Sequence, residues 1–126
     1  MKAFICYIAL LGLSGSLLAH SSSVSAQIAN REKFVARGTE PFWSVTVSKS
    51  GIVYSSPEVK KQTFPYVAPL TAQGRSADFV RVYRLRGNNT LILKKDNACS
   101  DGMSDKQYPY SAILILGNKV LEGCAE

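Results

Sequence analysis

The sequence predicts an all-β protein, built as a small antiparallel β-barrel or sandwich of six to eight short strands with one disulfide. Three observations lead to this prediction. Apolar and polar residues alternate with a period of two in several short runs, and glycine and asparagine separate some of these runs. After residue 26, apolar residues nowhere keep the helical spacing of three and four over three turns. The chain of 126 residues is long enough for one such domain.

The first 26 residues are typical of a cleaved export signal. Lys2 provides a short basic start, residues 3–19 are largely apolar, and residues 24–26 place small side chains at the cleavage positions. Glycine and serine break the apolar stretch, so it lacks the roughly 20 apolar residues of a transmembrane helix, and no later segment supplies them. We therefore expect a mature protein of residues 27–126, a single β domain of 126 − 26 = 100 residues in the periplasm or outside the cell.

The first predicted hairpin lies near the start of this domain. Over residues 43–48, tryptophan and valine alternate with serine and threonine. Ser50 and Gly51 form a turn, and residues 52–54 return as the second strand. Because the hydroxyl side chains favour water, Trp43 and the two valines must share the core face.

The rest of the domain contains an irregular region and two further hairpins. Proline punctuates residues 55–75, which we predict to be irregular apart from one short edge strand around residues 64–67. The next hairpin joins residues 78–86 to residues 90–95 through a turn at 87–89, and the last joins residues 110–116 to residues 119–124 through Gly117 and Asn118.

The cysteines predict one disulfide. Removal of the signal takes away Cys6 and His20, the single histidine, and leaves Cys99 and Cys124. In an exported chain an even pair of cysteines is typical of a disulfide, and closing a loop of this length stabilises a fold by roughly 3 to 4 kcal/mol. Lipoproteins carry their modified cysteine at the cleavage site, whereas Cys6 lies near the start of the apolar region. We therefore expect no lipid anchor.

Basic residues predominate, and several of them fall in one predicted hairpin. Removing Lys2 changes the formal net charge from +6 to +5. A basic patch on this hairpin would attract an anionic envelope polymer or lipid headgroups. The alternative is a solvated sheet face that keeps strand edges unpaired. No motif for nucleic-acid binding is present, so nucleic acid is not an expected partner. The basic residues concerned are Arg81, Arg84, Arg86, Lys94 and Lys95.

An aromatic pair stands at the entry to the first predicted strand, within the run RGTEPFWSV at 37–45. Gly38 permits a bend and Pro41 ends a hydrogen-bonded ladder, so Phe42 and Trp43 can bury a large apolar area in the core. The alternative is a ligand cleft in which Phe42 and Trp43 contact the ligand and Glu40 provides the polar group.

A polar segment surrounds Gly102, and two interpretations are open for it. Its side-chain oxygens are of the type that calcium prefers, although their spacing does not match an EF-hand loop. Aspartate and serine also cap turns through their own backbone. We favour a capped turn that leads Cys99 into its disulfide, and we predict no metal and no cofactor. The residues concerned are Asn97, Ser100, Asp101, Ser104 and Asp105.

The residue types argue against an enzyme. A serine nucleophile needs a positioned base and a cysteine nucleophile needs a free thiolate, but the expected mature chain has no histidine and both its cysteines are assigned to the disulfide. The usual zinc and copper ligands are missing for the same reason. A pair of carboxylates could serve a glycosidase, but nothing in the sequence brings two together. The acidic candidates are Glu40, Glu58, Asp96, Asp101 and Asp105.

Several runs resemble a family of uncharacterised bacterial exported proteins and lipoproteins, with members in cyanobacteria. They are RGTEPFWSV at 37–45, GIVYSSP at 51–57, QTFPYVAPL at 62–70, CSDGMSD at 99–105, YPYSA at 108–112 and LEGCA at 121–125. The resemblance covers essentially the whole mature domain. It implies export and no established activity. This chain differs from the lipoprotein members because it has no cysteine at the cleavage site.

Two functions follow as hypotheses. The first is a non-enzymatic binding or structural module of the cell envelope, with a basic and aromatic surface for an anionic or carbohydrate partner. The alternative is an inhibitor of c-type lysozymes, because Ser50, Gly51 and Tyr54 are similar to the Ser-Gly-x-x-Tyr loop that small β-barrel inhibitors insert into the enzyme cleft. The second inhibitor motif, Thr-Lys-Gly, is missing, and a basic protein would be repelled by a basic lysozyme.

Overall fold

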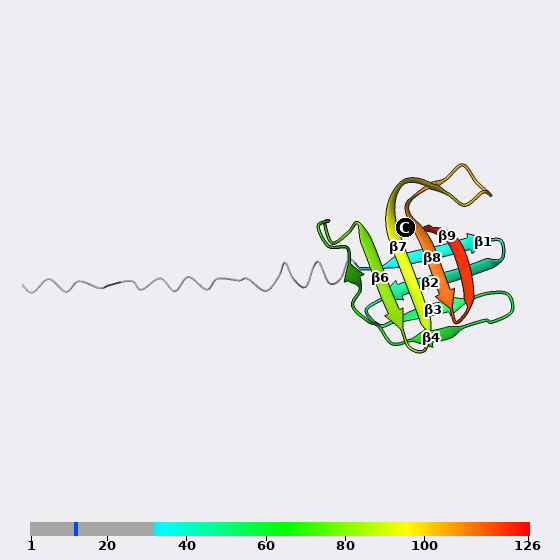
Figure 1. Ribbon diagram of the computed structural model, residues 1–126, viewed down its shortest axis with the longest axis horizontal. Coiled ribbons are helices and arrows are strands. Elements are labelled where there is room, and N and C mark those ends of the chain that lie inside the picture. Colours follow the sequence, from blue (N-terminus) through cyan, green and yellow to red (C-terminus); the bar gives the residue numbers. More distant parts are fainter. Residues whose placement is uncertain (1–11, 13–31) are drawn as a thin grey trace, which may run out of the picture.

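A computed structural model describes Gly12 and residues 32–126 (Figure 1). The predicted export signal, with Cys6 and His20, lies outside the described residues apart from Gly12. The described part of the chain is all-β, as predicted, and includes no helix that could cross a membrane. In chain order the strands are β1 (Phe34–Thr39), β2 (Phe42–Ser48), β3 (Gly51–Ser55), β4 (Gln62–Phe64), β5 (Leu70–Thr71), β6 (Val80–Leu85), β7 (Asn89–Ser100), β8 (Gln107–Leu116) and β9 (Lys119–Ala125).

All nine strands form one antiparallel sheet, in the order β4-β3-β2-β1-β9-β8-β7-β6-β5. The three predicted hairpins are confirmed as β2–β3, β6–β7 and β8–β9. The finer expectation of a barrel or sandwich of six to eight strands is not confirmed, because the nine strands form one sheet that is not closed. The edge strand expected around residues 64–67 is corrected, because the proline-rich region instead contains two short strands, β4 and β5, at opposite edges of the sheet. Pro65 and Pro69 lie between them and have no backbone N–H to donate to a ladder.

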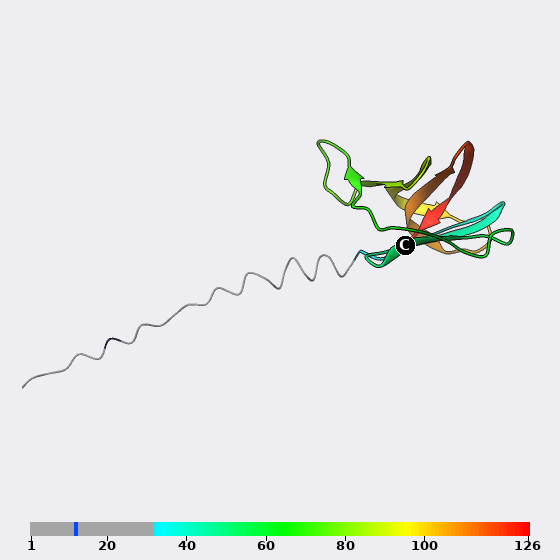
Figure 2. The same cartoon turned by 90° about the horizontal axis from the view of Figure 1, so that it is seen from below.

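The short connection between β4 and β5 forces the sheet to curve. These strands lie at opposite edges, and only residues 65–69 join them, which span about 20 Å when fully extended. In a flat sheet of nine strands the edge strands would be about 38 Å apart, at about 4.8 Å per strand. The sheet therefore bends until its halves face each other, and Figures 1 and 2 show β6–β9 crossing β1–β4 as a second layer.

The hydrophobic core lies between the two halves of the sheet. Trp43 and the valines of β2 are buried, as their alternation with hydroxyl residues predicts. Tyr66 and Val67 of the β4–β5 connection pack against the same core and cover its open side. The buried core residues are Phe34, Ala36, Trp43, Val45, Val47, Ile52, Tyr54, Phe64, Tyr83, Leu85, Leu91, Leu93, Ala112, Leu114, Leu121 and Ala125.

Two glycines allow the Trp43 ring to lie against neighbouring strands. Gly38 is opposite Trp43 in the β1–β2 pair, and a Cβ atom on Gly38 would overlap the indole nitrogen. A Cβ atom on Gly123 of β9 would overlap the backbone carbonyl of Arg37 and would also touch the indole ring. The indole Nε1 donates a hydrogen bond to the carbonyl oxygen of Glu122, at 3.3 Å. Trp43 therefore ties together three adjacent strands, β2, β1 and β9.

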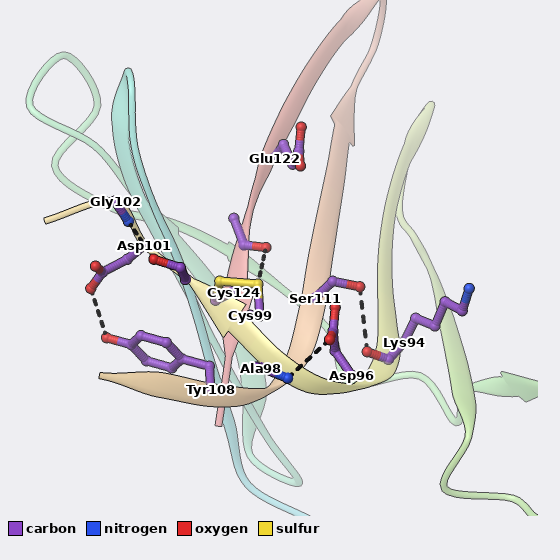
Figure 3. The surroundings of a disulfide bond; sticks show 12 residues. Lys94, Asp96, Ala98, Cys99, Asp101, Gly102, Tyr108, Ser111, Glu122 and Cys124 are labelled. Atoms are coloured by element: carbon purple, nitrogen blue, oxygen red, sulfur yellow. Dashed lines mark hydrogen bonds between the residues drawn. A yellow bond between two sulfur atoms is a disulfide. The ribbon is translucent and has the colours of Figure 1, made fainter. Parts of the chain in front are cut away.

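The predicted disulfide between Cys99 and Cys124 is confirmed, with a Cα–Cα distance of 5.7 Å. It joins β7 to β9, which are separated in the sheet by β8 (Figure 3). The pairing of β7 with β8 shifts register between Lys95 and Cys99, where the long strand is irregular. The bond therefore fixes the far end of the β7–β8 hairpin onto the last strand.

The loop after Cys99 is a capped turn, as we favoured from the sequence. One carboxylate oxygen of Asp101 accepts hydrogen bonds from the backbone N–H groups of Met103 and Ser104, at 2.9 and 3.0 Å. The other accepts one from the hydroxyl of Tyr108, at 3.2 Å (Figure 3). The Thr39 hydroxyl donates to the backbone carbonyl of Asp101, which holds the loop against the end of β1.

Replacing Gly123 with alanine should destabilise the fold. The added methyl group meets backbone that cannot move aside, so we expect a loss at the upper end of the about 1 to 3 kcal/mol typical of overpacking. Chemical unfolding followed by Trp43 fluorescence measures it. Glu122→Ala, at an exposed side chain of the same strand, is the control and should change stability by less than about 0.5 kcal/mol. Equal stabilities of the two variants would contradict the close packing at Gly123.

Removing the disulfide should also lower the free energy of unfolding. Replacing both Cys99 and Cys124 with serine releases a loop with a sequence separation of 25, for which loop entropy predicts a loss of about 3.5 kcal/mol. Denaturant titration of the parent and the double variant measures this difference. The parent in reductant should match the variant in oxidising buffer. Free thiols in the unreduced, denatured parent would show that the bond does not form.

Candidate functional site

The β1–β2 turn separates Phe42 from Trp43. The turn residues are Glu40 and Pro41, joined by a cis peptide bond, and Phe42 is the first residue of β2. Since successive strand residues point to opposite faces, Trp43 enters the core with 4% of its surface exposed, while Phe42 is 57% exposed. The core interpretation is therefore confirmed for Trp43, whereas Phe42 is displayed on the surface.

A cleft of about 460 Å³ lies beside Phe42. Its volume falls within the range of small-ligand sites. Phe42, Tyr54 and two prolines supply apolar surface, and two carboxylates and one ammonium group supply charge. The cleft is lined by Thr39, Glu40, Pro41, Phe42, Tyr54, Ser56, Pro57, Glu58 and Lys119. These residues come from the β1–β2 turn, β3 and the loop that follows it, and the start of β9.

A second, more open hollow of about 720 Å³ lies over β1, β2 and β3 and also reaches Phe42. Its lining includes the side chains of Ser44, Thr46 and Ser55, and the hydroxyls of Ser44 and Ser55 are hydrogen bonded across the strands at 2.9 Å. Phe42 therefore stands between an apolar cleft with charged groups and a hydroxyl-bearing sheet surface.

The cleft brings together two of the acidic residues that the sequence left apart. Glu40 and Glu58 both line it, and both are exposed to solvent. The exposed carboxylates of Glu40 and Glu58 can accept hydrogen bonds from a ligand in the cleft.

The basic residues of the β6–β7 hairpin do not form one patch, which corrects the expectation that the hairpin would bring them together. Arg81 and Lys95 lie on the strand face that points toward the core, whereas Arg84 and Lys94 lie on the outer face. Arg86 is in the turn after β6. The period of two divides the cations between the two faces, because their spacing mixes odd and even positions.

Asp78 engages both inward-facing cations. Lys95 forms an ion pair with the Asp78 carboxylate at 2.9 Å, and Arg81 donates to the Asp78 backbone carbonyl at 3.0 Å. Hydrogen bonds from Ser76 and Lys95, together with the charge of Lys95, lower the pKa of Asp78 to about 2. The Arg81 guanidinium also lies 4.7 Å from the centre of the Phe34 ring. Arg81 and Lys95 therefore have structural partners.

The segment that is similar to the lysozyme-inhibitor loop displays only its first residue. Ser50 is exposed in the β2–β3 turn, whereas Gly51 is buried at the start of β3. Tyr54 lies within β3 and is 5% exposed. The inhibitor hypothesis stays a prediction, and in this arrangement the Tyr54 ring belongs to the core.

A polar cluster around Glu32 joins the two halves of the sheet, and the sequence analysis did not find it. The Glu32 carboxylate accepts hydrogen bonds from the hydroxyls of Tyr66, at 2.5 Å, and Tyr83, at 3.0 Å, and lies 3.3 Å from the Lys49 ammonium. These groups come from the segment before β1, the β4–β5 connection, β6 and the β2–β3 turn. They are far apart in sequence and follow no motif, so only the folded topology reveals the cluster.

The cluster shifts the ionisation of its members. Partial burial raises the pKa of Glu32, but hydrogen bonds from Tyr66, Tyr83 and Lys49 outweigh it and hold this pKa below its ordinary value. Burial, followed by the hydrogen bond to Glu32, raises the pKa of Tyr83. Glu32 is therefore a carboxylate and Tyr83 a neutral donor at neutral pH, which is the pairing that stabilises the contact.

Among Gly12 and residues 32–126, no group of three or more histidine, cysteine, aspartate or glutamate side chains is placed to hold a metal ion. Comparisons with protein-family models, curated proteins and solved structures find no match for this chain. The cleft and the hollow beside Phe42 are therefore the candidate functional site.

The Glu32 cluster predicts a pH-dependent contribution to stability. Because folding lowers the pKa of Glu32 below 4.5, its stabilising effect is present above about pH 4.5 and is lost as the pH falls through the folded pKa. Glu32→Gln should melt lower than the parent at pH 7, with a loss of about 2 kcal/mol, and the difference should shrink in acid. Glu122→Gln, at an exposed position, is the control. A pH-independent difference would contradict the role of the charge.

Proposed function

We propose that the mature protein is an exported, non-enzymatic binding module of the bacterial cell envelope, and that its ligand site is the surface around Phe42. The observation that carries this proposal is the exposure of Phe42. It is the only exposed aromatic residue among residues 32–126, and it borders both the cleft and the hydroxyl-bearing hollow. Large aromatic side chains dominate binding energies when a ligand covers them.

Phe42 lies on a rigid part of the fold, so little conformational entropy should be lost when a ligand binds to it. Its chain neighbour Trp43 is held in the core by packing against Gly38 and by the hydrogen bond to the carbonyl of Glu122. The loop near the end of β1 is held by the Thr39–Asp101 hydrogen bond and by the disulfide. A side chain on such a scaffold is preorganised, so less entropy is lost when a ligand binds.

The chemistry of this surface suits a carbohydrate of the envelope. The Phe42 ring and the prolines can contact the apolar faces of sugar rings. Carboxylates and hydroxyls can accept hydrogen bonds from sugar hydroxyls, and Lys119 can donate to ring and carbonyl oxygens. An extended glycan would use both hollows, because they meet at Phe42 and share Thr39, Ser56 and Pro57.

Phe42→Ala should weaken glycan binding at least tenfold, which corresponds to about 1.4 kcal/mol of lost aromatic contact. The probes are soluble oligosaccharides of N-acetylated amino sugars and insoluble cell-wall glycan, measured by calorimetry and by co-sedimentation. Val120→Ala removes an exposed apolar side chain outside both hollows and should bind like the parent. Both variants should keep the parent melting temperature within a few degrees.

Two results would overturn this proposal. The first is that the parent binds neither the soluble oligosaccharides nor the insoluble glycan. The second is that Phe42→Ala binds as well as Val120→Ala does. Either result would leave the Phe42 cleft without a glycan ligand.

A further inference from the structure

The outer face of β5–β9 carries an apolar row that the core does not use. The strand register places Leu70, Val82, Ile92 and Ile113 directly opposite one another on four successive strands. Directly opposed residues point to the same side of a sheet, and their chain neighbours Tyr83, Leu93 and Leu114 fill the core. The row therefore faces outward, and Leu70 is 51% and Ile113 39% exposed.

A second row of outward-facing residues runs beside the first and ends at Val120 of β9. The pairs Thr90–Ile115 and Ile115–Val120 place Val120 directly opposite Ile115, two residues along β9 from Glu122, and Val120 is 66% exposed. The outer face of β2 shows the expected pattern for a solvated sheet, because it presents serine and threonine. An exposed block of isoleucine and valine on the other half is typical of an interaction surface.

The two turns at the end of this block carry three cations and no acids of their own. The β6–β7 and β8–β9 turns lie side by side, because the N–H of Gly117 donates to the carbonyl of Asn88 at 2.9 Å. Residues 84–90 and 115–120 include Arg84, Arg86 and Lys119 and no aspartate or glutamate. None of the three cations takes part in an ion pair within the described part of the chain. On the same outer face, Glu122 of β9 lies directly opposite Ile113 and ends the row of Leu70, Val82, Ile92 and Ile113, and Asp96 lies farther along β7.

We infer that this turn end docks on an anionic membrane surface. Val120 and Ile115, at the turn end, would sit at the boundary between headgroups and acyl chains, and Arg84 and Arg86 would bind lipid phosphates. A bilayer surface offers both apolar and anionic groups, whereas a soluble anionic polymer would leave the apolar block in water. A second copy of the chain could cover the same apolar block, and the test below distinguishes it from a membrane. This inference does not depend on the Phe42 site.

The test is flotation of the purified protein with vesicles of phosphatidylcholine alone or with added phosphatidylglycerol, at low and physiological salt. The parent should bind the anionic vesicles in a salt-dependent way and leave the neutral ones unbound. Replacing both Arg84 and Arg86 with glutamine should lower the partition coefficient about thirtyfold, at about 1 kcal/mol for each arginine. Val120→Ser should lower it severalfold.

A matched control variant tests whether vesicle binding depends on the position of the two arginines or only on the net charge of the protein. Replacing Lys60 and Lys61 with glutamine removes the same charge from the exposed segment before β4 and should leave vesicle binding within twofold of the parent. Phe42→Ala should also bind vesicles normally, and the double arginine variant should bind glycans normally. The two proposed surfaces can therefore fail separately.

Four results would overturn the inference. The first is that the parent does not bind anionic vesicles at low salt, and the second is that the Lys60 and Lys61 variant loses as much vesicle binding as the double arginine variant does. The third is that Val120→Ser binds vesicles as well as the parent does, while the parent binds soluble polyphosphate as tightly as it binds anionic vesicles. The fourth is that the parent forms a dimer in sedimentation equilibrium and that Val120→Ser dissociates this dimer. The third result would identify a polyanion site, and the fourth an interface between copies of the chain.

Discussion

The fold depends on one covalent constraint, the connection of residues 65–69 between the two edge strands of a nine-stranded sheet. A chain that short cannot reach from edge to edge of a flat sheet, so the sheet must curve and bury one face against itself. The connection also contributes to the interior, because Tyr66 packs on the core and donates to Glu32, which in turn binds Tyr83 of β6. The open side of the sheet is thus held by a polar contact and by the backbone itself.

A second set of contacts fixes the opposite region, where β2, β1 and β9 meet. Trp43 needs Gly38 and Gly123 for its ring to fit, and Cys124, which follows Gly123, bonds to Cys99. Two sequence runs that are about 80 residues apart, one around Trp43 and one around Gly123, therefore form a single packing unit. Its rigidity matters for the surface, because the strand that buries Trp43 necessarily displays Phe42 on the other side.

Local patterns predicted the parts of this structure that depend on neighbours in sequence. The period of two identified the three hairpins, and cysteine arithmetic identified the disulfide. Strand β1 was missed, because Arg37 and Gly38 interrupt its apolar alternation. The Glu32 cluster could not be predicted, since it depends on register and curvature, whereas the division of the basic residues between two faces follows from their odd and even positions and could have been read from the sequence. The sequence singled out Phe42 and Trp43 together, and only the strand face assigned them to different roles.

Because the inner face of the sheet forms the hydrophobic core, a ligand-binding site can lie only elsewhere on the sheet. A single curved sheet has one buried face, and the polar groups within it are satisfied by one another, so ligands can reach only the outer face and the rims. The outer faces of the two halves of the sheet differ in chemistry. The outer face of β1–β3 presents hydroxyl groups and Phe42, whereas that of β6–β9 presents aliphatic side chains flanked by arginine. Lys119 belongs to both regions, because it lines the Phe42 cleft and begins β9 at the turn end. A domain docked on a membrane through that end would therefore hold its Phe42 cleft close to the bilayer, where the glycans of the envelope are anchored or begin.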